Sequence, residues 1–107
     1  MKILLDECID QRFRLQLPEH DCRTAQFVGF AGLKNDLLLD AAERDGFEVL
    51  LTADQNMPTQ QNLGGRALSN VILCAPTNRL RDLLRLVPSL KKALAGIACG
   101  AAVVVRL

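Results

Sequence analysis

The sequence predicts an α/β fold of three layers, in which a mostly parallel sheet of about four to five strands is flanked by helices. Two observations lead to this expectation. Short apolar runs typical of buried strands alternate along the chain with segments of helical periodicity, an order that favours parallel strands joined by helices. In addition, 107 residues of which 50% are hydrophobic suit one compact domain, so residues 1–107 are expected to form a single domain.

The expected strands are short runs bounded by charges or turn-forming residues. Ile3, Leu4 and Leu5 form the first of them, and most of the others are also uninterrupted by polar residues. Strands of this kind are covered on both faces, as in a parallel sheet between helices. The strands are expected at 2–6, 21–25, 47–52, 71–74 and 101–105.

A first helix is expected to begin near Glu7. Its apolar residues Ile9, Phe13 and Leu17 recur every four positions, and Pro18 closes the segment. The spacing therefore predicts a helix with one buried face.

Two further helical segments carry recognisable ends. Asn35 can cap a helix that Gly46 ends, because glycine readily adopts the left-handed conformation found there. The leucines of residues 80–87 form a helical stripe, Pro88 breaks it, and the apolar pattern continues as far as Ile97.

Charge is distributed unevenly along the chain. The net charge of +1 excludes the broad basic surface that dominates non-specific binding to nucleic acids. However, residues 1–54 carry a net charge of −5 and residues 55–107 carry +6. An acidic half that can hold cations is thus joined to a basic half that can hold phosphates. The basic residues of the segment 79–92 can equally do no more than solvate the outer face of a helix.

No segment predicts export or insertion into a membrane. Residues 1–5 run directly into two acids, unlike the start of a signal peptide. The longest apolar run near an end, 94–105, is shorter than a bilayer span and contains two glycines. We therefore expect a cytoplasmic protein that does not act on a membrane.

Cysteine and histidine offer little basis for a soft-metal site or for histidine catalysis. Cys8, Cys22, Cys74 and Cys99 form no C-x-x-C pair and lie in apolar segments, so reduced and buried thiols are expected. His20 is the one candidate for catalysis by histidine. Tyrosine and tryptophan are absent and the four phenylalanines are expected mostly in the core, so no aromatic platform for bases is expected.

Acidic residues follow two of the expected strands. Asp6 ends the first strand and Asp54 follows the third, so the two converge if these strands are neighbours. Asn35 and Asp36 stand at the start of a helix on the same edge. Clustered carboxylates repel one another unless a cation is present, and oxygen ligands of this kind select hard ions such as Mg²⁺. Such a site could activate water and neutralise charge on a phosphodiester.

A long polar segment follows the third strand. Residues 53–66 contain five amides, one proline and two glycines without a helical or strand period. Loops of this length in small domains tend to serve a function.

A phosphate-accepting receiver domain is a competing interpretation of the same edge. It places acids after the first strand and an acceptor aspartate after the third, here Asp54. It also needs a hydroxyl residue after the fourth strand and a lysine after the fifth. Here Cys74 and Ala75 end the fourth strand, and Arg106 and Leu107 end the last, so the lysine is missing.

Several short segments follow one another with the order and spacing of a known family. They are Leu4-Leu5-Asp6-Glu7, Gly32-Leu33-Lys34-Asn35, Leu51-Thr52-Ala53-Asp54-Gln55-Asn56, Gln60-Gln61-Asn62-Leu63, Ala75-Pro76-Thr77-Asn78-Arg79-Leu80 and Val87-Pro88. With these segments nearly the whole chain resembles the small single-domain PIN-like proteins.

The resemblance implies a PIN-like fold, an acidic pocket that binds Mg²⁺ or Mn²⁺, and hydrolysis of RNA phosphodiester bonds. Many relatives are toxins of bacterial toxin–antitoxin pairs. A cognate antitoxin protein and a homodimer are therefore implied as well.

The resemblance also assigns roles to individual residues. Asp6 matches the first metal-binding acid and Asp54 matches the acid after the third strand. Where many relatives carry an acid at the start of the middle helix, Asn35 aligns, with Asp36 one place along. Where others carry a second acid two residues beyond Asp54, this chain has Asn56. An amide oxygen can ligate a metal but carries no charge, so these departures should lower the affinity for metal.

Two hypotheses follow. In the first, the chain is a metal-dependent ribonuclease and the toxin of a toxin–antitoxin pair, in which Asp6, Asp36 and Asp54 hold the ion. Glu7 assists, and Asn56 orients water or a phosphate oxygen. Substrate contacts are expected from Asn35, Thr52, Gln60, Gln61 and Arg66. In the second, the chain is a PIN-like module with impaired catalysis that acts by binding a partner protein or RNA.

Overall fold

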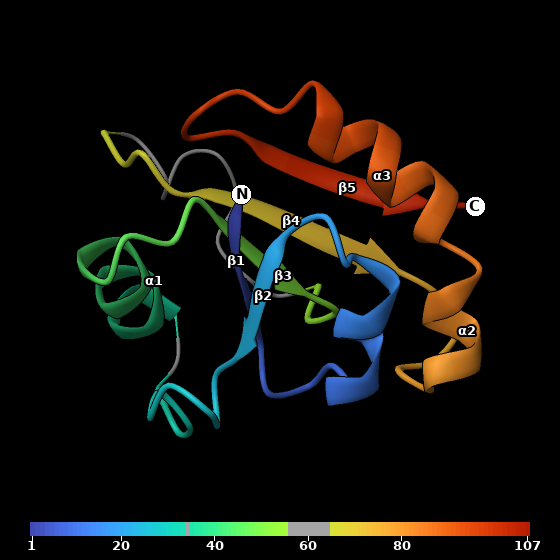
Figure 1. Cartoon of the computed structure of the whole chain (residues 1–107), viewed down its shortest axis with the longest axis horizontal. Helices are drawn as coiled ribbons and strands as arrows, with labels where there is room; N and C mark the ends of the chain where they lie inside the picture. Colours follow the sequence, from blue (N-terminus) through green and yellow to red (C-terminus); the bar gives the residue numbers. More distant parts are fainter. Residues whose placement is uncertain (34, 56–64) are drawn as a thin grey trace.

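The computed structural model describes residues 1–33, 35–55 and 65–107 (Figure 1). The strands are β1 (Lys2–Leu5), β2 (Asp21–Thr24), β3 (Val49–Thr52), β4 (Ser69–Cys74) and β5 (Ala102–Arg106). The helices are the 3-10 helix η1 (Gln11–Gln16) and the α-helices α1 (Asn35–Arg44), α2 (Leu80–Leu84) and α3 (Val87–Ala95).

All strands lie in one parallel sheet in the order β2-β1-β3-β4-β5. The chain thus places β2 on one side of β1 and then crosses to place β3 on the other side. This confirms the predicted parallel sheet. It also confirms that β1 and β3, whose ends carry acidic residues, are neighbours.

Helices cover both faces of the sheet and complete the predicted three layers (Figure 1). On one face Phe13 of η1, Leu83 of α2 and Leu90 of α3 pack against Ile3 and Leu5 of β1. On the other face Leu38, Leu39 and Ala42 of α1 pack with Leu4 and Leu50 from the sheet. Alternate residues of β1 and β3 therefore enter opposite cores, which is why these strands contain few polar residues, whereas Asp21 and Arg23 of the edge strand β2 are exposed.

The first predicted helix is shorter and tighter than expected. The chain turns first, with the amide of Ile9 donating to the carbonyl of Asp6 at 3.0 Å, and the 3-10 helix η1 begins only at Gln11. The carboxylate of Asp10 caps it by accepting the amide of Arg12 at 2.9 Å. The spacing nevertheless identified the buried face, because Ile9 and Phe13 lie in the core as expected.

The predicted effects of Gly46 and Pro88 on helix ends are confirmed, whereas Asn35 is the first residue of α1 rather than the residue that precedes it. Gly46 has a φ of 83° just after α1, and the amide of Phe47 donates to the carbonyl of Ala42 at 3.0 Å. Pro88 lies in the first turn of α3, where its missing amide removes no helical hydrogen bond, and the helical stripe is split into α2 and α3.

Strand β4 begins two residues earlier than expected, at Ser69. The hydroxyl of Ser69 donates to the carbonyl of Ala98 at 2.6 Å and accepts the amide of Ala101 at 3.1 Å. Because its polar group is fully paired, Ser69 can be buried at the start of a central strand.

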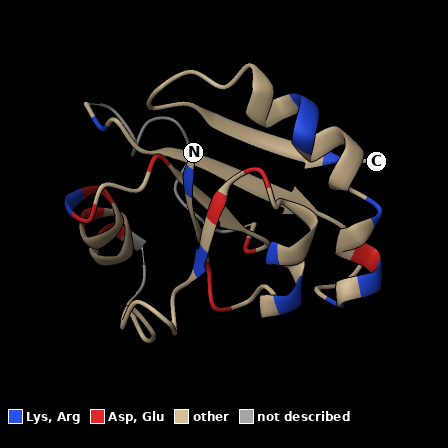
Figure 2. Ribbon diagram, in the orientation of Figure 1, with Lys and Arg blue, Asp and Glu red and all other residues tan. Residues whose placement is uncertain are grey.

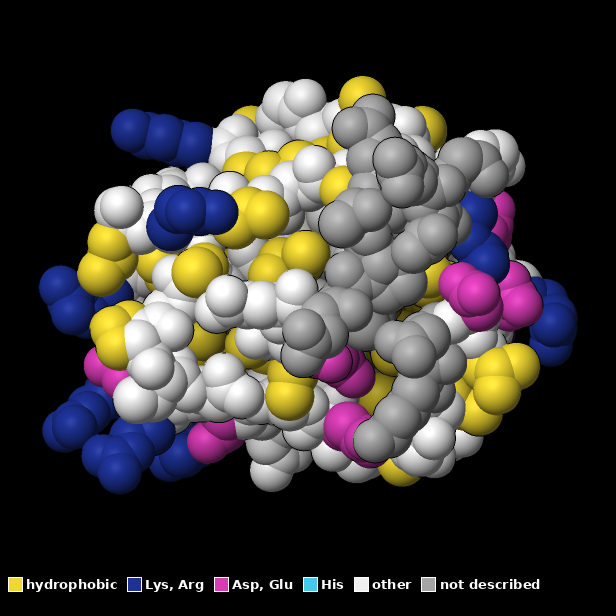
Figure 3. All heavy atoms as spheres, turned by 180° about the vertical axis from the view of Figure 1, so that it is seen from behind, with side chains coloured by type: hydrophobic (Ala, Val, Ile, Leu, Met, Phe, Trp, Pro, Cys, Tyr) yellow, Lys and Arg dark blue, Asp and Glu magenta, His cyan; other side chains and the backbone are white. Residues whose placement is uncertain are grey.

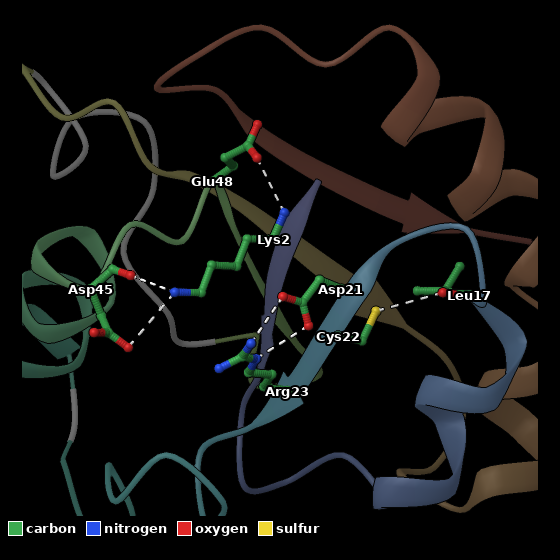
Figure 4. Close-up of polar contacts among 7 residues, drawn as sticks. All are labelled: Lys2, Leu17, Asp21, Cys22, Arg23, Asp45 and Glu48. Carbon is green, nitrogen blue, oxygen red and sulfur yellow. Dashed lines mark hydrogen bonds and ion pairs between the residues drawn. The ribbon is translucent and has the colours of Figure 1, made fainter.

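Polar contacts hold the amino-terminal edge of the sheet (Figure 4). The amide of Lys2 donates to the carboxylate of Glu48 at 3.1 Å. The ammonium of Lys2 donates to the carbonyl of Asp45 at 2.6 Å and lies 4.5 Å from the ring centre of Phe47.

No helix among the described residues has the length and apolar character needed to cross a membrane.

Candidate functional site

Asp6 and Thr52 meet where β1 and β3 end. Asp6 directly follows β1, Thr52 is the last residue of β3, and the amide of Asp6 donates to the carbonyl of Leu51 at 2.9 Å. This is the carboxyl edge of the sheet, at the position where consecutive strands turn to opposite sides. Ligands of open parallel sheets bind at such positions.

The carboxylate of Asp6 is buried, with only 9% of the residue exposed. Its Oδ1 accepts the amide of Glu7 at 2.8 Å, and its Oδ2 accepts the hydroxyl of Thr52 at 2.8 Å. Among the residues that the structure describes, no lysine, arginine or histidine forms an ion pair with Asp6. A buried carboxylate without a cationic partner is costly, so a bound cation would stabilise this edge.

The hydroxyl of Thr52 connects Asp6 to the segment after β3. Thr52 is fully buried, and its Oγ1 also accepts the amide of Asp54 at 3.0 Å. One hydroxyl therefore donates to the carboxylate of Asp6 and fixes the backbone at Asp54, whose residue is exposed. The side chain of Asp54 therefore extends from a backbone position that the hydroxyl of Thr52 links to Asp6.

Cys8 is a member of this site to which the sequence analysis gave no role. Its thiol lies 3.6 Å from Oδ2 of Asp6 and 3.6 Å from Oγ1 of Thr52, and it accepts the amide of Ala53 at 3.4 Å. Burial is the main cause that raises the pKa of the Cys8 thiol, so this group stays protonated at neutral pH. Its position two residues after Asp6, in the turn that leaves β1, was the signal available in the sequence.

The other acidic residues stand farther from this network. Glu7 is exposed, and its Oε2 accepts the amide of Gly32 at 3.2 Å, which links the turn after β1 to the segment after β2. Asp36 is exposed in the first turn of α1, and Asn35 is the first residue of that helix. Within residues 1–33, 35–55 and 65–107, no three acids, histidines or cysteines gather as metal ligands.

Arg66 lies at the opposite edge of the sheet. It lies three positions before the start of β4, and its guanidinium pairs with Asp40 at 2.7 Å and with Glu43 at 3.2 Å, both on α1. These hydrogen bonds raise the pKa of Arg66, so its charge is permanent. The guanidinium thus links α1 to the segment that precedes β4, away from Asp6.

Three other predicted site residues, Asn56, Gln60 and Gln61, lie outside the described residues.

A polar hollow of about 630 Å³ opens beside the network. Glu7, Cys8, Thr24, Gln26 and Asn78 are among the residues that line it. It brings the turn after β1, the end of β2 and the segment before α2 to one surface. A substrate approaching Asp6 could occupy this space.

Basic residues surround a different part of the molecule. Figure 2 shows lysines and arginines on η1, α2 and α3. In Figure 3, which views the molecule from behind, this side lies at the left, and most of the blue side chains are there. The exposed residues of this group on or beside α2 and α3 are Arg79, Arg81, Arg85, Lys91 and Lys92. Lys91 lies 3.8 Å from the carboxylate of Glu19. The charge asymmetry seen along the sequence therefore becomes an asymmetry between regions of the surface.

No protein-family model matches the sequence, and searches of curated proteins and of solved structures found no significant match. The family expected from the sequence motifs therefore stays a prediction.

Proposed function

We propose that this protein is a metal-dependent ribonuclease that hydrolyses RNA phosphodiester bonds at the edge formed by Asp6, Thr52 and Asp54. The observation that carries the proposal is the buried carboxylate of Asp6, which has no cationic partner among the described residues and stands where β1 and β3 diverge. Oδ1 of this carboxylate accepts one hydrogen bond and keeps a lone pair for a cation, whereas Oδ2 accepts both the hydroxyl of Thr52 and the thiol of Cys8.

The residues present suit a hard divalent ion. Mg²⁺ typically binds one or two carboxylates and keeps several waters and substrate phosphates as its other ligands, so Asp6 and Asp54 together are a sufficient protein contribution. Asp36 remains the predicted third acid. An ion held here supplies activation of water and neutralisation of phosphate charge.

The protein's own groups have definite tasks in this proposal. Thr52 orients the carboxylate of Asp6 by donating to one of its oxygens, and the amide of Glu7 restrains the other. The polar hollow is lined by Cys8, which contacts Asp6, and by Glu7 and Asn78, so it offers space for a phosphodiester next to the site. Asn56 and the loop amides Gln60 and Gln61 keep the water-orienting and substrate roles that the resemblance to PIN-like proteins gives them.

The same resemblance supports the further proposal that the protein is the toxin of a toxin–antitoxin pair. It also supports a cognate antitoxin as protein partner and a homodimer. A receiver domain is less well supported, since the residue that ends β5 is Arg106 rather than a lysine.

Cleavage of RNA by purified protein tests the proposal. The wild type, Asp6→Asn and the control Asp45→Asn are incubated with RNA in Mg²⁺, in Mn²⁺ and in chelator. Asp45 is an exposed acid at the amino-terminal edge, so the control removes the same charge far from Asp6. We expect metal-dependent cleavage by the wild type and by Asp45→Asn, and none by Asp6→Asn. Equal cleavage by all three proteins, or cleavage that persists in chelator, contradicts the proposal.

Binding of the ion can be measured without cleavage. A ligand at one hundred times its dissociation constant stabilises the folded state by about 2.7 kcal/mol. Mn²⁺ should therefore raise the melting temperature of the wild type and of Asp45→Asn, and should leave that of Asp6→Asn unchanged.

The second hypothesis, a module that binds a partner without catalysis, is motivated by Asn35 and Asn56. These amides stand where the resemblance to PIN-like proteins places acids. Wild-type protein that is neither stabilised by Mn²⁺ nor active on RNA would support this function instead.

A further inference from the structure

A second hollow adjoins the one beside Asp6. It has a volume of about 330 Å³ and is lined by Gln11, Arg14, Cys22, Arg23, Thr24 and Phe27. Gln11 and Thr24 also line the larger hollow, which reaches Glu7 and Cys8. The two spaces therefore meet at η1 and β2 and lead from the outer edge of β2 toward the site at Asp6. We call the smaller space the β2 groove.

Phe27 presents an aromatic ring to solvent in this groove. It is 78% exposed, whereas Phe13 and Phe47 are buried as the sequence analysis expected. Phe27 thus departs from the expectation that the phenylalanines lie mostly in the core. The amide of Phe27 donates to the hydroxyl of Thr24 at 3.1 Å, so the backbone below the ring is anchored. An exposed aromatic ring on an anchored backbone can stack on a base.

The charges around the groove favour an anion. Arg14 on η1 forms no ion pair with any described acid, while Arg23 is held by Asp21 through two contacts of 3.2 Å (Figure 4). Burial raises the pKa of Cys22 to about 11, so its thiol is neutral and contributes an apolar wall. The groove therefore combines a free cation, an aromatic face and the amide of Gln11.

A protein strand is a poorer fit to this edge. β2 has four residues, and the carbonyl of Thr24 already accepts the amide of Val28 at 3.2 Å. Little backbone is left for a partner strand to pair with.

We infer that the β2 groove binds one nucleotide of single-stranded RNA next to the bond that is cleaved at Asp6, with its base on Phe27 and its phosphate at Arg14. The inference rests on the proposed function and names the part of the substrate that this surface recognises. A volume of about 330 Å³ is at the small end of ligand sites. A base paired within a duplex cannot reach the ring of Phe27, which is why the ligand is single-stranded.

Binding of a short fluorescent single-stranded RNA in chelator tests the inference, because cleavage is then prevented. Phe27→Ala should weaken binding roughly five- to hundredfold, as removal of one stacking platform does. Arg14→Ala should weaken binding and reduce the slope of log affinity against log salt by about 0.7. The controls are Leu15→Ala, an exposed apolar side chain of η1, and Arg106→Ala, an exposed arginine on the far strand β5.

The outcomes separate this inference from the proposed function. Wild-type affinity in Phe27→Ala and Arg14→Ala, equal losses in the two control variants, or equal affinity for duplex RNA overturns the inference. Absence of RNA binding by the wild type overturns it as well. If Asp6→Asn cleaves RNA like the wild type but binding still depends on Phe27, the site at Asp6 is wrong and the groove stands. If Asp6→Asn alone loses cleavage and Phe27 has no effect on binding, the groove is wrong and the site stands.

Discussion

The hydroxyl of Thr52 donates a hydrogen bond of 2.8 Å to the carboxylate of Asp6, across 46 positions of sequence. Both residues are buried, and the bond joins the ends of β1 and β3. The amide of Asp54 donates to the same hydroxyl at 3.0 Å. A single side chain thus satisfies one group from each of the two segments that form the candidate site.

Replacement of this hydroxyl should destabilise the fold. Thr52→Val preserves the shape of the side chain but leaves the carboxylate of Asp6 and the amide of Asp54 each short of a partner. Loss of a hydrogen bond that leaves buried groups unsatisfied costs about 1–3 kcal/mol. Urea denaturation should show a larger loss for Thr52→Val than for Thr52→Ser, which keeps the hydroxyl. A Thr52→Val variant as stable as the wild type would show that the hydroxyl contributes no net stabilisation.

Acid titration should reveal the ion pair that begins η1. Arg12 donates to Asp10 from its side chain at 2.7 Å and from its amide, and these bonds lower the pKa of Asp10 to about 2 from 3.8. Because the folded-state pKa is the lower one, the stabilisation is complete above pH 3.8 and is lost as the pH falls toward 2. NMR titration of the Asp10 carboxyl should show this pKa directly.

Arg12→Ala is the matched test of the cause. It should move the pKa of Asp10 toward 3.8 without reaching it, since the amide of residue 12 still donates. An unchanged pKa in this variant would assign the shift to another group.

The buried face of η1 should dominate its contribution to stability. Phe13 is fully buried, whereas Leu15 on the same helix is 61% exposed. Phe13→Ala should lower the free energy of unfolding by about 3–5 kcal/mol, and Leu15→Ala should change it by no more than about 0.5 kcal/mol. Chemical denaturation of both variants measures the difference. Similar losses would mean that η1 packs differently against α2.

The turn before β5 should tolerate no side chain at Gly100. This residue has a φ of 69°, and a Cβ there would lie 2.6 Å from the carbonyl oxygen of Arg66. Gly29 also has a positive φ, 84°, but its Cβ would meet no atom within 4 Å. Gly29→Ala should cost about 1–2 kcal/mol from the backbone alone, and Gly100→Ala should cost about 1–3 kcal/mol more from the clash. Thermal denaturation of the two variants compares them, and equal melting temperatures would refute the clash.

Local chemistry was enough to predict the order of the elements. Strands buried on both faces leave uninterrupted apolar runs such as Leu4 and Leu5, and helices leave spacings such as that of Phe13 and Leu17. Gly46 and Pro88 act through their own backbone geometry, so their effects on helix ends do not depend on distant contacts. The predicted start of β4 was wrong because it depends on distant contacts. Ser69 can be buried there only because the fold brings hydrogen-bond partners to its hydroxyl.

The candidate site was predictable only in outline. Acids at the ends of two strands indicated one edge, and the pairing of β1 with β3 confirmed that Asp6 and the segment of Asp54 are neighbours. The participation of Cys8, and the pairing of Arg66 with α1 at the opposite edge, could not be inferred from residue types. Both depend on which segments the crossover connections bring together.

The sequence by itself determined that the chain alternates strands with helices, buries apolar runs on both faces of a sheet and carries acids at strand ends. These properties are periodic or local, so a one-dimensional pattern records them. Only the tertiary structure decided that Thr52 donates to Asp6, that Phe27 faces solvent and that Arg66 fastens α1 to β4. Such contacts join residues far apart in sequence, and their free energy depends on burial that no single segment controls.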